Sequence, residues 1–271
     1  MITLKAATEL LSSAGIDSPR DEARRIFSAI GHIPAHATVS PDCSTDLPEV
    51  HDAILRRAKH EPLQYIIGEV DFYRESYKVT PDCLIPRSDT EVLVDFAVKN
   101  LPRGASFLDI CTGSGCIAIS TVKNTKNTRA IAVDISEGAL KIARENAERN
   151  GVTDRIEFIK GDALLGSFGE NIFAVLSNPP YVADAVYEKL ERDIFFEPRE
   201  AFVGGDDGAN FYRALTPMYR DVIHEHGFIA YEIGYDQGEL IKGIAKECGM
   251  TAEIIKDYSG NDRVAVLRRI I

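Results

Sequence analysis

The chain has no tryptophan and only three methionines among its 271 residues, and it also lacks any long apolar run. Its first segment, "MITLKAATELLSSAG", carries Lys5 and Glu9 among spaced apolar positions, which is typical of an amphipathic helix rather than of a signal peptide. No later run reaches the length that a bilayer requires. The sequence therefore predicts neither a membrane anchor nor a membrane partner.

Cysteine is also scarce, with five residues and no Cys-x-x-Cys pair, which favours a reducing cytoplasm. His224 and His226 lie two residues apart in a segment that we expect to be helical, so they would point to different faces and would not bind a metal together. We expect no metal site and a cytoplasmic location.

Basic residues are fewer than acidic ones. The 31 basic and 42 acidic residues give a net charge of -11, and the basic residues form no cluster. Residues 1–70 hold 7 basic and 10 acidic side chains, a balance of -3. Such a surface repels a phosphate backbone, so a direct nucleic-acid substrate is not expected.

The first 60 residues show three amphipathic helical patterns, of which the second opens with Ser18 as N-cap and Pro19 in the first turn. We expect a small helical bundle over residues 1–68. The stretch that follows is rich in aromatic and β-branched residues with turn signals, which predicts a hairpin connector over residues 69–90.

Residues 91–271 alternate short apolar runs with helical stretches, the pattern of a parallel α/β sheet. The tail predicts two further strands joined by a Ser-Gly-Asn-Asp turn, which would close the sheet as an antiparallel pair. The expected strands are "SFLDIC", "AIAVDI", "IEFIKGD", "FAVLSN" and "FIAYEIG", and the expected helices are "CIAISTVKN", "SEGALKIARENAERNG" and "NFYRALTPMYRDVIHEHG".

A glycine loop follows the first of these strands, in "DICTGSGCIAIS". Gly113 and Gly115 allow a sharp turn and a close approach of a ligand to the backbone, at the N-terminus of a helix. Asp134 ends the next strand, where a carboxylate can accept both hydroxyls of a ribose. Together these features predict an adenosine-type ligand, although a dinucleotide fits them too.

Asp109 and Asp162 bear on the choice of ligand. We expect Asp109, two residues before Cys111, to repel a pyrophosphate, whereas S-adenosylmethionine carries a sulfonium and an ammonium group. This favours a methyl donor. Asp162 ends the third strand and fits beside an adenine edge with Ala163, but a helix N-cap explains Asp162 equally well.

The fourth strand ends in "SNPPY", where two prolines fix a rigid corner. The Asn178 side-chain carbonyl and the Pro179 backbone carbonyl can accept the two hydrogens of a planar nitrogen and orient its lone pair toward a methyl group. The Tyr181 ring can stack on the same planar group. Because both this corner and the glycine loop end strands, we expect them to face one crevice.

With these motifs in place, the sequence resembles the peptide chain release factor N5-glutamine methyltransferases, a family of class I S-adenosylmethionine-dependent enzymes. The resemblance rests on "NPPY" together with "PLQYIIG", "IPRSDTE", "EPREAFVGGDDG", "YEIGYDQGE" and "KDYSGNDRV", in that order and spacing, and it covers nearly the whole chain. It implies an N-terminal helical substrate-docking domain that is followed in the chain by a Rossmann-like seven-stranded domain. It also implies S-adenosylmethionine as cofactor, and a class 1 release factor as protein substrate, methylated at the glutamine of its Gly-Gly-Gln motif.

The resemblance also implies roles for particular residues. The donor would contact Asp109, Cys111, Thr112, Gly113, Ser114, Gly115, Asp134, Asp162, Ala163 and Asn178. The substrate glutamine would contact Asn178, Pro179, Pro180, Tyr181 and Arg87, with Asn178, Pro179 and Tyr181 catalytic. Cys111 departs from the family, whose loop usually has glycine there, so a positive φ would put donor affinity in doubt. For Arg87, a salt bridge with a nearby acid is an equally good explanation.

Two other functions share some of these features. A nucleic-acid adenine methyltransferase also uses the Asn-Pro-Pro-Tyr corner but needs a basic surface. A nicotinamide-dependent oxidoreductase uses the glycine loop and the acid but leaves the corner unexplained, as does a binding module without catalysis.

Overall fold

The computed structural model describes residues 1–170 and 172–270, and the chain divides into two compact units. The first unit contains Met1–Glu69 together with Glu191–Phe196, and the second contains Val70–Leu190 and Glu197–Ile271. A short segment from late in the chain therefore belongs to the N-terminal unit. The division at residues 68 and 90, drawn from sequence, stays a prediction.

The first unit is a helical bundle, as the sequence predicts. Apolar residues spaced by three or four positions, such as Leu4, Ala7 and Leu11, face a common core. Arg57 is only 6% exposed, binds the Glu22 carboxylate, and donates through Nη1 to Asp193 Oδ2 at 2.7 Å, which ties the late segment to the bundle. The elements are β1 (Ile2–Thr3), α1 (Leu4–Ser13), α2 (Pro19–Ala29), η1 (Ala37–Val39), β2 (Ser44–Thr45), α3 (Pro48–Ala58), α4 (Leu63–Ile67) and η4 (Arg192–Phe196).

A hairpin of β3 (Glu69–Phe72) and β4 (Glu75–Lys78) follows. Its two turn residues, Tyr73 and Arg74, have φ angles of 48° and 70°, the left-handed pair that a tight hairpin turn needs.

The second unit is built on a seven-stranded sheet in the order β10-β11-β9-β8-β5-β6-β7. Neighbouring strands from β9 to β7 are parallel, and β11 is antiparallel to both β9 and β10. The strands are β5 (Ser106–Ile110), β6 (Arg129–Asp134), β7 (Ile156–Lys160), β8 (Ile172–Ser177), β9 (Ile223–Glu232), β10 (Met250–Lys256) and β11 (Asp262–Arg269). This is a Rossmann-like fold with the antiparallel closing pair that the sequence predicts.

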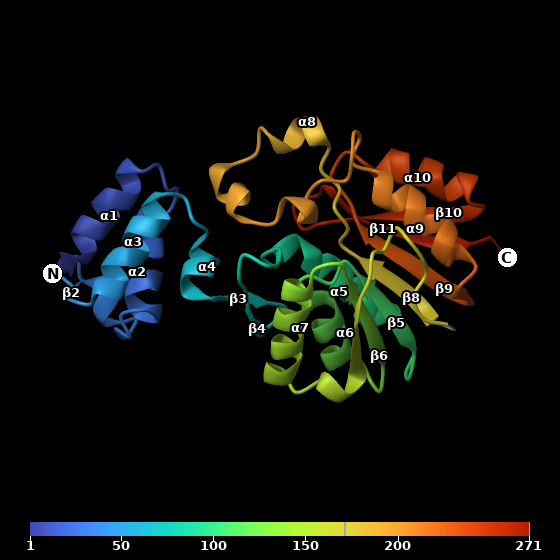
Figure 1. The fold of residues 1–271 in the computed structure, drawn as a ribbon, viewed down its shortest axis with the longest axis horizontal. Coiled ribbons are helices and arrows are strands. Elements are labelled where there is room, and N and C mark those ends of the chain that lie inside the picture. Colours follow the sequence, from blue (N-terminus) through green and yellow to red (C-terminus); the bar gives the residue numbers. More distant parts are fainter. Residues whose placement is uncertain (171, 271) are drawn as a thin grey trace. The chain divides into compact units, whose positions relative to one another are not determined.

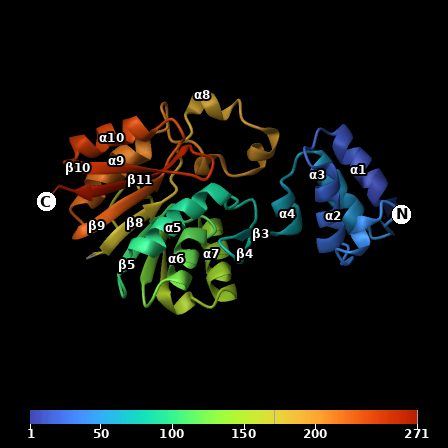
Figure 2. The ribbon, with the colours of Figure 1, turned by 180° about the vertical axis from the view of Figure 1, so that it is seen from behind.

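Helices cover both faces of the sheet, with α5, α6 and α7 on one face and α9 and α10 on the other (Figures 1 and 2). Successive strand residues alternate between the two cores: Phe107 packs under the first set and Leu108 under the second. The helical elements are η2 (Ser88–Thr90), α5 (Glu91–Asn100), α6 (Cys116–Asn124), α7 (Glu137–Arg149), η3 (Thr153–Arg155), α8 (Asp184–Tyr187), η5 (Arg199–Ala201), α9 (Asn210–Arg220) and α10 (Gly238–Glu247).

One helix is shorter than the sequence pattern suggests. The pattern predicts a helix through Gly227, but α9 ends at Arg220 and β9 begins at Ile223. Val222 and Ile223 are β-branched, and Ile223 pairs with Ile172 in the sheet, so tertiary pairing decides the conformation. His224 and His226 therefore lie on a strand, where His224 stacks on Phe173 with ring centroids 5.7 Å apart.

The strand order reverses between β5 and β8. From β5 the chain runs outward through β6 and β7, and it then returns to place β8 on the other side of β5. Ile110 pairs with Ser177, and the Ser177 hydroxyl donates to the Ile110 carbonyl at 2.5 Å. The glycine loop and the Asn-Pro-Pro-Tyr corner leave the sheet directly beyond this pair, at the point where α/β proteins bind ligands.

Candidate functional site

A cavity of about 220 Å³ lies at this reversal point. It brings together residues from the glycine loop (Cys111 and Gly113), from the end of β6 (Asp134), and from the corner after β8 (Asn178 and Pro180). The loop after β7 adds Asp162 and Ala163. Three separate sequence motifs thus line one cavity, as their strand-end positions predict.

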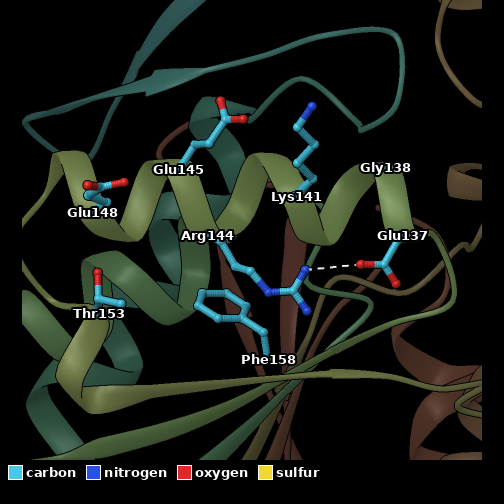
Figure 3. Close-up of a pocket in the computed structure, with 8 residues that line it drawn as sticks. All are labelled: Glu137, Gly138, Lys141, Arg144, Glu145, Glu148, Thr153 and Phe158. Carbon is cyan, nitrogen blue, oxygen red and sulfur yellow. Dashed lines mark hydrogen bonds and ion pairs between the residues drawn. The ribbon is translucent and has the colours of Figure 1, made fainter.

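A larger hollow, of about 660 Å³, lies along α7. Figure 3 shows the side chains that line it. Exposed or half-buried side chains of both charges line it, and Arg144 donates to the Glu137 carboxylate at 3.1 Å while lying over the Phe158 ring. None of the residues that carry the sequence motifs lines this hollow within the described part of the chain. The smaller cavity is therefore the candidate site.

The two loop glycines have different tasks. A Cβ added to Gly113 would meet nothing within 4 Å, so this backbone faces open space in the cavity and a ligand can approach it. A Cβ on Gly115 would lie 3.0 Å from Ile119 Cδ1 and 3.1 Å from the Ala143 Cβ, so this glycine lets α6 and α7 pack closely. Both have positive φ, 55° and 82°.

Cys111 also has a positive φ, 61°, although it carries a side chain. The condition named from the sequence, a positive φ at this position, is met, and Cys111 lines the cavity, while its effect on donor affinity stays a prediction. A left-handed conformation costs a non-glycine residue about 1 kcal/mol or more. The strain is therefore stored directly at the cavity wall.

Asp134 is joined to the glycine loop by a hydrogen bond. Its Oδ2 accepts the Gly113 N–H at 2.8 Å and its Oδ1 accepts the Ser136 N–H at 2.9 Å. Burial raises the pKa of this carboxyl, and the two backbone N–H groups oppose that shift. A carboxylate has about four acceptor positions, so lone pairs remain for ribose hydroxyls.

Asp109 lies behind the loop rather than in the cavity. It is fully buried, and its Oδ2 accepts from Thr112 Oγ1 at 2.6 Å and from the Ala118 N–H at 3.0 Å. It therefore caps the first turn of α6 and fixes the loop. Burial raises its pKa to about 7. It does not face an approaching ligand at this cavity, so the electrostatic argument against a pyrophosphate loses its basis, and donor contact by Asp109 stays a prediction.

The remaining loop residues, Thr112, Ser114 and Gly115, are buried, and Thr112 and Ser114 line a small adjoining cavity of about 30 Å³. Buried Asn146 of α7 donates to the Ser114 carbonyl at 2.9 Å and holds the loop backbone.

In the loop after β7, Asp162 Oδ1 accepts from the Leu164 N–H at 2.9 Å, so Asp162 forms a local turn and does not cap a helix. Ala163 is 7% exposed at the cavity wall.

The Asn-Pro-Pro-Tyr corner lies between this cavity and a second one of about 50 Å³. Asn178 lines both, and Tyr181 lines the smaller one together with Arg87 and Glu232. Arg87 lines this cavity and also pairs with the nearly buried Glu197, as the salt-bridge explanation predicts, while its contact with a substrate stays a prediction. Glu197 in turn accepts the Ile85 N–H at 2.9 Å.

Sequence reasoning missed several residues that line the larger cavity, among them Cys83, Leu84, Ile135, Leu164 and Phe211. It also missed Glu232. That residue had a signal, because it is a carboxylate that ends the apolar run "FIAYE" and so lies at the same sheet edge as the other strand-end motifs.

The fold and this site define a Rossmann-like methyltransferase. Residues 88–205 match the family model described as methyltransferase small domain, and residues 3–68 match the PrmC N-terminal domain. A solved methyltransferase from Pyrococcus furiosus shares the fold, with a TM-score of 0.54 at 20% identity over 72% of this chain and 89% of that one.

Two curated relatives narrow the class. A release factor glutamine methyltransferase from Moorella thermoacetica is 36% identical over 96% of this chain and 95% of its own length. One from Thermodesulfovibrio yellowstonii is 40% identical over 86% and 85%. The chain belongs to the release factor glutamine methyltransferase family. No helix in residues 1–170 or 172–270 has the length and apolar character to span a membrane.

Proposed function

We propose that this chain transfers a methyl group from S-adenosylmethionine to the side-chain amide nitrogen, N5, of the glutamine in the Gly-Gly-Gln motif of class 1 peptide chain release factors. The observation that carries the proposal is the cavity in which the glycine loop, Asp134 and the Asn-Pro-Pro-Tyr corner meet. Family membership supports the same reaction.

The cavity residues fit the methyl donor. Gly113 offers open backbone, Asp134 keeps free acceptor lone pairs for a ribose, and Ala163 with half-buried Asp162 offers backbone beside an adenine. Exposed Ile135 and Leu164 add apolar surface for a flat ring. When bound, S-adenosylmethionine supplies an electrophilic methyl group on a sulfonium. We assign donor binding to the loop from Cys111 to Gly115 and to these residues.

The corner residues act on the methyl acceptor. An amide nitrogen is a weak nucleophile because its lone pair is delocalised, so its orientation matters. The Asn178 side-chain carbonyl and the Pro179 backbone carbonyl accept its two N–H hydrogens and hold the nitrogen in place. Pro180 keeps this arrangement rigid, Tyr181 covers the planar amide, and Arg87 lines the substrate side of the site. The nitrogen loses its proton to water after it has been methylated.

A protein substrate rather than a nucleic acid is part of this proposal. The net charge of -11 and the balance of -3 over residues 1–70 oppose binding to phosphates, and a glutamine in an exposed loop needs no base flipping. We assign docking of the release factor to the helical unit. A cytoplasmic location is proposed as well, supported by five free cysteines.

The test is incubation with an isotopically labelled methyl donor, a release factor and, in a parallel arm, adenine-containing DNA. We expect one added methyl group on the glutamine of the Gly-Gly-Gln peptide in mass spectrometry. A release factor with that glutamine replaced serves as the control. Label in the DNA at a comparable rate, or in the control factor, would contradict the proposal.

A further inference from the structure

Glu232 is a buried carboxylate next to the corner that carries Asn178. It ends β9, where the preceding residue, Tyr231, pairs with Ser177 of β8. Its side chain is 1% exposed and lines the cavity of about 50 Å³ that Asn178 and Tyr181 also line. The proposed reaction assigns Glu232 no contact with donor or substrate. Burying a carboxylate costs free energy, so its position here indicates another role in the site.

Two hydroxyl groups donate to this carboxylate. Thr90 Oγ1 donates to Oε2 at 2.5 Å, and the Tyr181 phenol donates to Oε1 at 3.2 Å. An ionised carboxylate can only accept hydrogen bonds, and each hydroxyl has one proton. Burial and the Glu232 charge raise the pKa of Tyr181 far above neutrality, so its proton stays in place. The direction of both hydrogen bonds is therefore fixed by Glu232.

The Thr90 hydroxyl transmits this direction to Asn178. Because its proton points to Glu232, its lone pairs are left to accept, and Asn178 Nδ2 donates to Thr90 Oγ1 at 3.4 Å. An asparagine amide that turns its NH2 group to Thr90 turns its carbonyl oxygen the other way. The reverse orientation would present two donors to a substrate NH2 group, which has only donors to offer.

We propose that Glu232 is a positioning residue that sets Asn178 as a hydrogen-bond acceptor through Thr90 and fixes the Tyr181 ring through its phenol. This inference rests on the proposed function, because the acceptor is needed for an amide substrate. Glu232 touches neither donor nor reacting nitrogen, and its effect is on the orientation of the residues that do.

The charge of Glu232 depends on the groups that face it. Arg263 of β11 favours the ionised form, Asp89 of η2 opposes it, and the Thr90 and Tyr181 hydroxyls favour it. The Tyr212 phenol of α9 donates to the backbone carbonyl of Glu232, at 2.9 Å, and to Gln237 Oε1, at 3.4 Å. Burial outweighs these stabilising contacts and raises the pKa of Glu232 to about 7. A protonated carboxyl would need an acceptor and would turn one hydroxyl around.

The kinetic test uses Glu232→Gln, which keeps the shape but replaces one acceptor oxygen with a donor. At saturating donor, we expect kcat with the release factor to fall about 10- to 100-fold while the Kd for S-adenosylmethionine changes less than about threefold. Thr90→Val should lower kcat by a similar factor, whereas Thr90→Ser, which keeps the hydroxyl, should retain most of the wild-type activity. In the double variant, the effects of Glu232→Gln and Thr90→Val should be far from additive. Tyr231→Phe, a buried hydroxyl deletion on the same strand, is the matched control and should keep wild-type activity.

Two further readouts separate positioning from simple structural support. The wild-type kcat should decrease as the pH falls through about 7, whereas Glu232→Gln, which resembles the protonated form permanently, should lose this dependence. In the absence of any substrate, the Asn178 side-chain NH2 signals in an NMR spectrum should shift with the same midpoint as the Glu232 carboxyl and should not titrate in Glu232→Gln.

A Glu232→Gln enzyme with a kcat within twofold of wild type would overturn the inference. Asn178 side-chain NH2 signals that change neither with the pH nor with this substitution would overturn it as well. The NMR result needs no methylation. It therefore tests the role of Glu232 even if wild type fails to methylate a release factor, an outcome that would count against the proposed function alone.

Discussion

The Gly113 backbone N–H donates to Asp134 Oδ2 at 2.8 Å, so a hydrogen bond joins the acid at the end of β6 to the loop at the end of β5. Strand pairing brings them to one edge, since Ile110 of β5 lies beside Val133 of β6. The carboxylate therefore has two tasks, holding the loop and offering its remaining lone pairs.

The first prediction follows from these two tasks. Asp134→Ala should weaken S-adenosylmethionine binding by about 2 to 4 kcal/mol, because charge-assisted hydrogen bonds to two ribose hydroxyls are lost and the loop loses an anchor. Isothermal titration calorimetry measures the effect. Asp154→Ala, which removes an exposed acid in η3, is the control and should bind the donor normally. Equal affinity of the two variants for S-adenosylmethionine would contradict the assignment of Asp134 to the ribose.

The meeting of Asp134, the glycine loop and the Asn178 corner could be predicted because all of them end parallel strands, whose carboxyl ends share one edge. The position of Asp109 could not, because a strand residue two places before the loop can point to either face. Its burial follows from the alternation that places Leu108 in the opposite core. The Thr90–Glu232 contact joins residues 142 positions apart, and no local pattern encodes it.

The second prediction concerns the methyl acceptor. Asn178→Ala should lower kcat by about 100-fold or more while the Kd for the donor changes little, because the lost carbonyl orients the reacting amide. Steady-state rates at saturating donor, together with calorimetry, give both values. Asn124→Ala, at the exposed end of α6, controls for the loss of an asparagine. Turnover within a few-fold of wild type would leave the corner with only a structural role.

The third prediction uses the strained conformation of Cys111. Cys111→Gly removes the left-handed penalty but gives the unfolded chain more freedom, so the free energy of unfolding should change by less than about 1 kcal/mol. Its affinity for S-adenosylmethionine should equal or exceed that of wild type, because a side chain leaves the cavity wall. Cys111→Val, which is β-branched at a φ of 61°, should destabilise the protein by about 2 kcal/mol.

Thermal melts and donor titrations of the two variants test this pair. Weaker donor binding by Cys111→Gly would show that the thiol itself contributes to the site. Equal stability of the glycine and valine variants would contradict the strain at this position.

The fourth prediction is a pH dependence of stability. The pKa of Asp109 is about 7 in the folded chain, compared with an ordinary value of 3.8, so the folded state binds this proton more tightly. The free energy of unfolding therefore falls as the pH rises from about 4 through about 7. Asp109→Asn lacks this contribution and should lose less stability between pH 5.5 and pH 8, by about 2 kcal/mol, because only about 1.5 pH units of this interval lie below the pKa of Asp109 in the folded chain.

Denaturant unfolding at the two pH values, with Asp154→Asn as control, measures the difference. Glu232 contributes in the same direction, so some pH dependence should remain in Asp109→Asn. A variant with the full wild-type pH dependence would show that Asp109 is ionised in the folded chain throughout this range.

The last prediction concerns docking by the helical unit. Deleting residues 1–60 removes α1, α2 and α3 and also the partners that Asp193 has in that unit, Arg57 and His60. If this unit binds the body of the release factor, the deletion should raise the KM for the intact factor about tenfold or more and leave donor binding nearly unchanged. A short peptide that carries only the Gly-Gly-Gln loop cannot reach the missing surface, so its KM should be the same for both forms. Circular dichroism and donor calorimetry establish first that the shortened chain folds. Equal KM values for the intact factor would remove the docking role, and a matching rise for the peptide would place the defect in the methyl-transfer site instead.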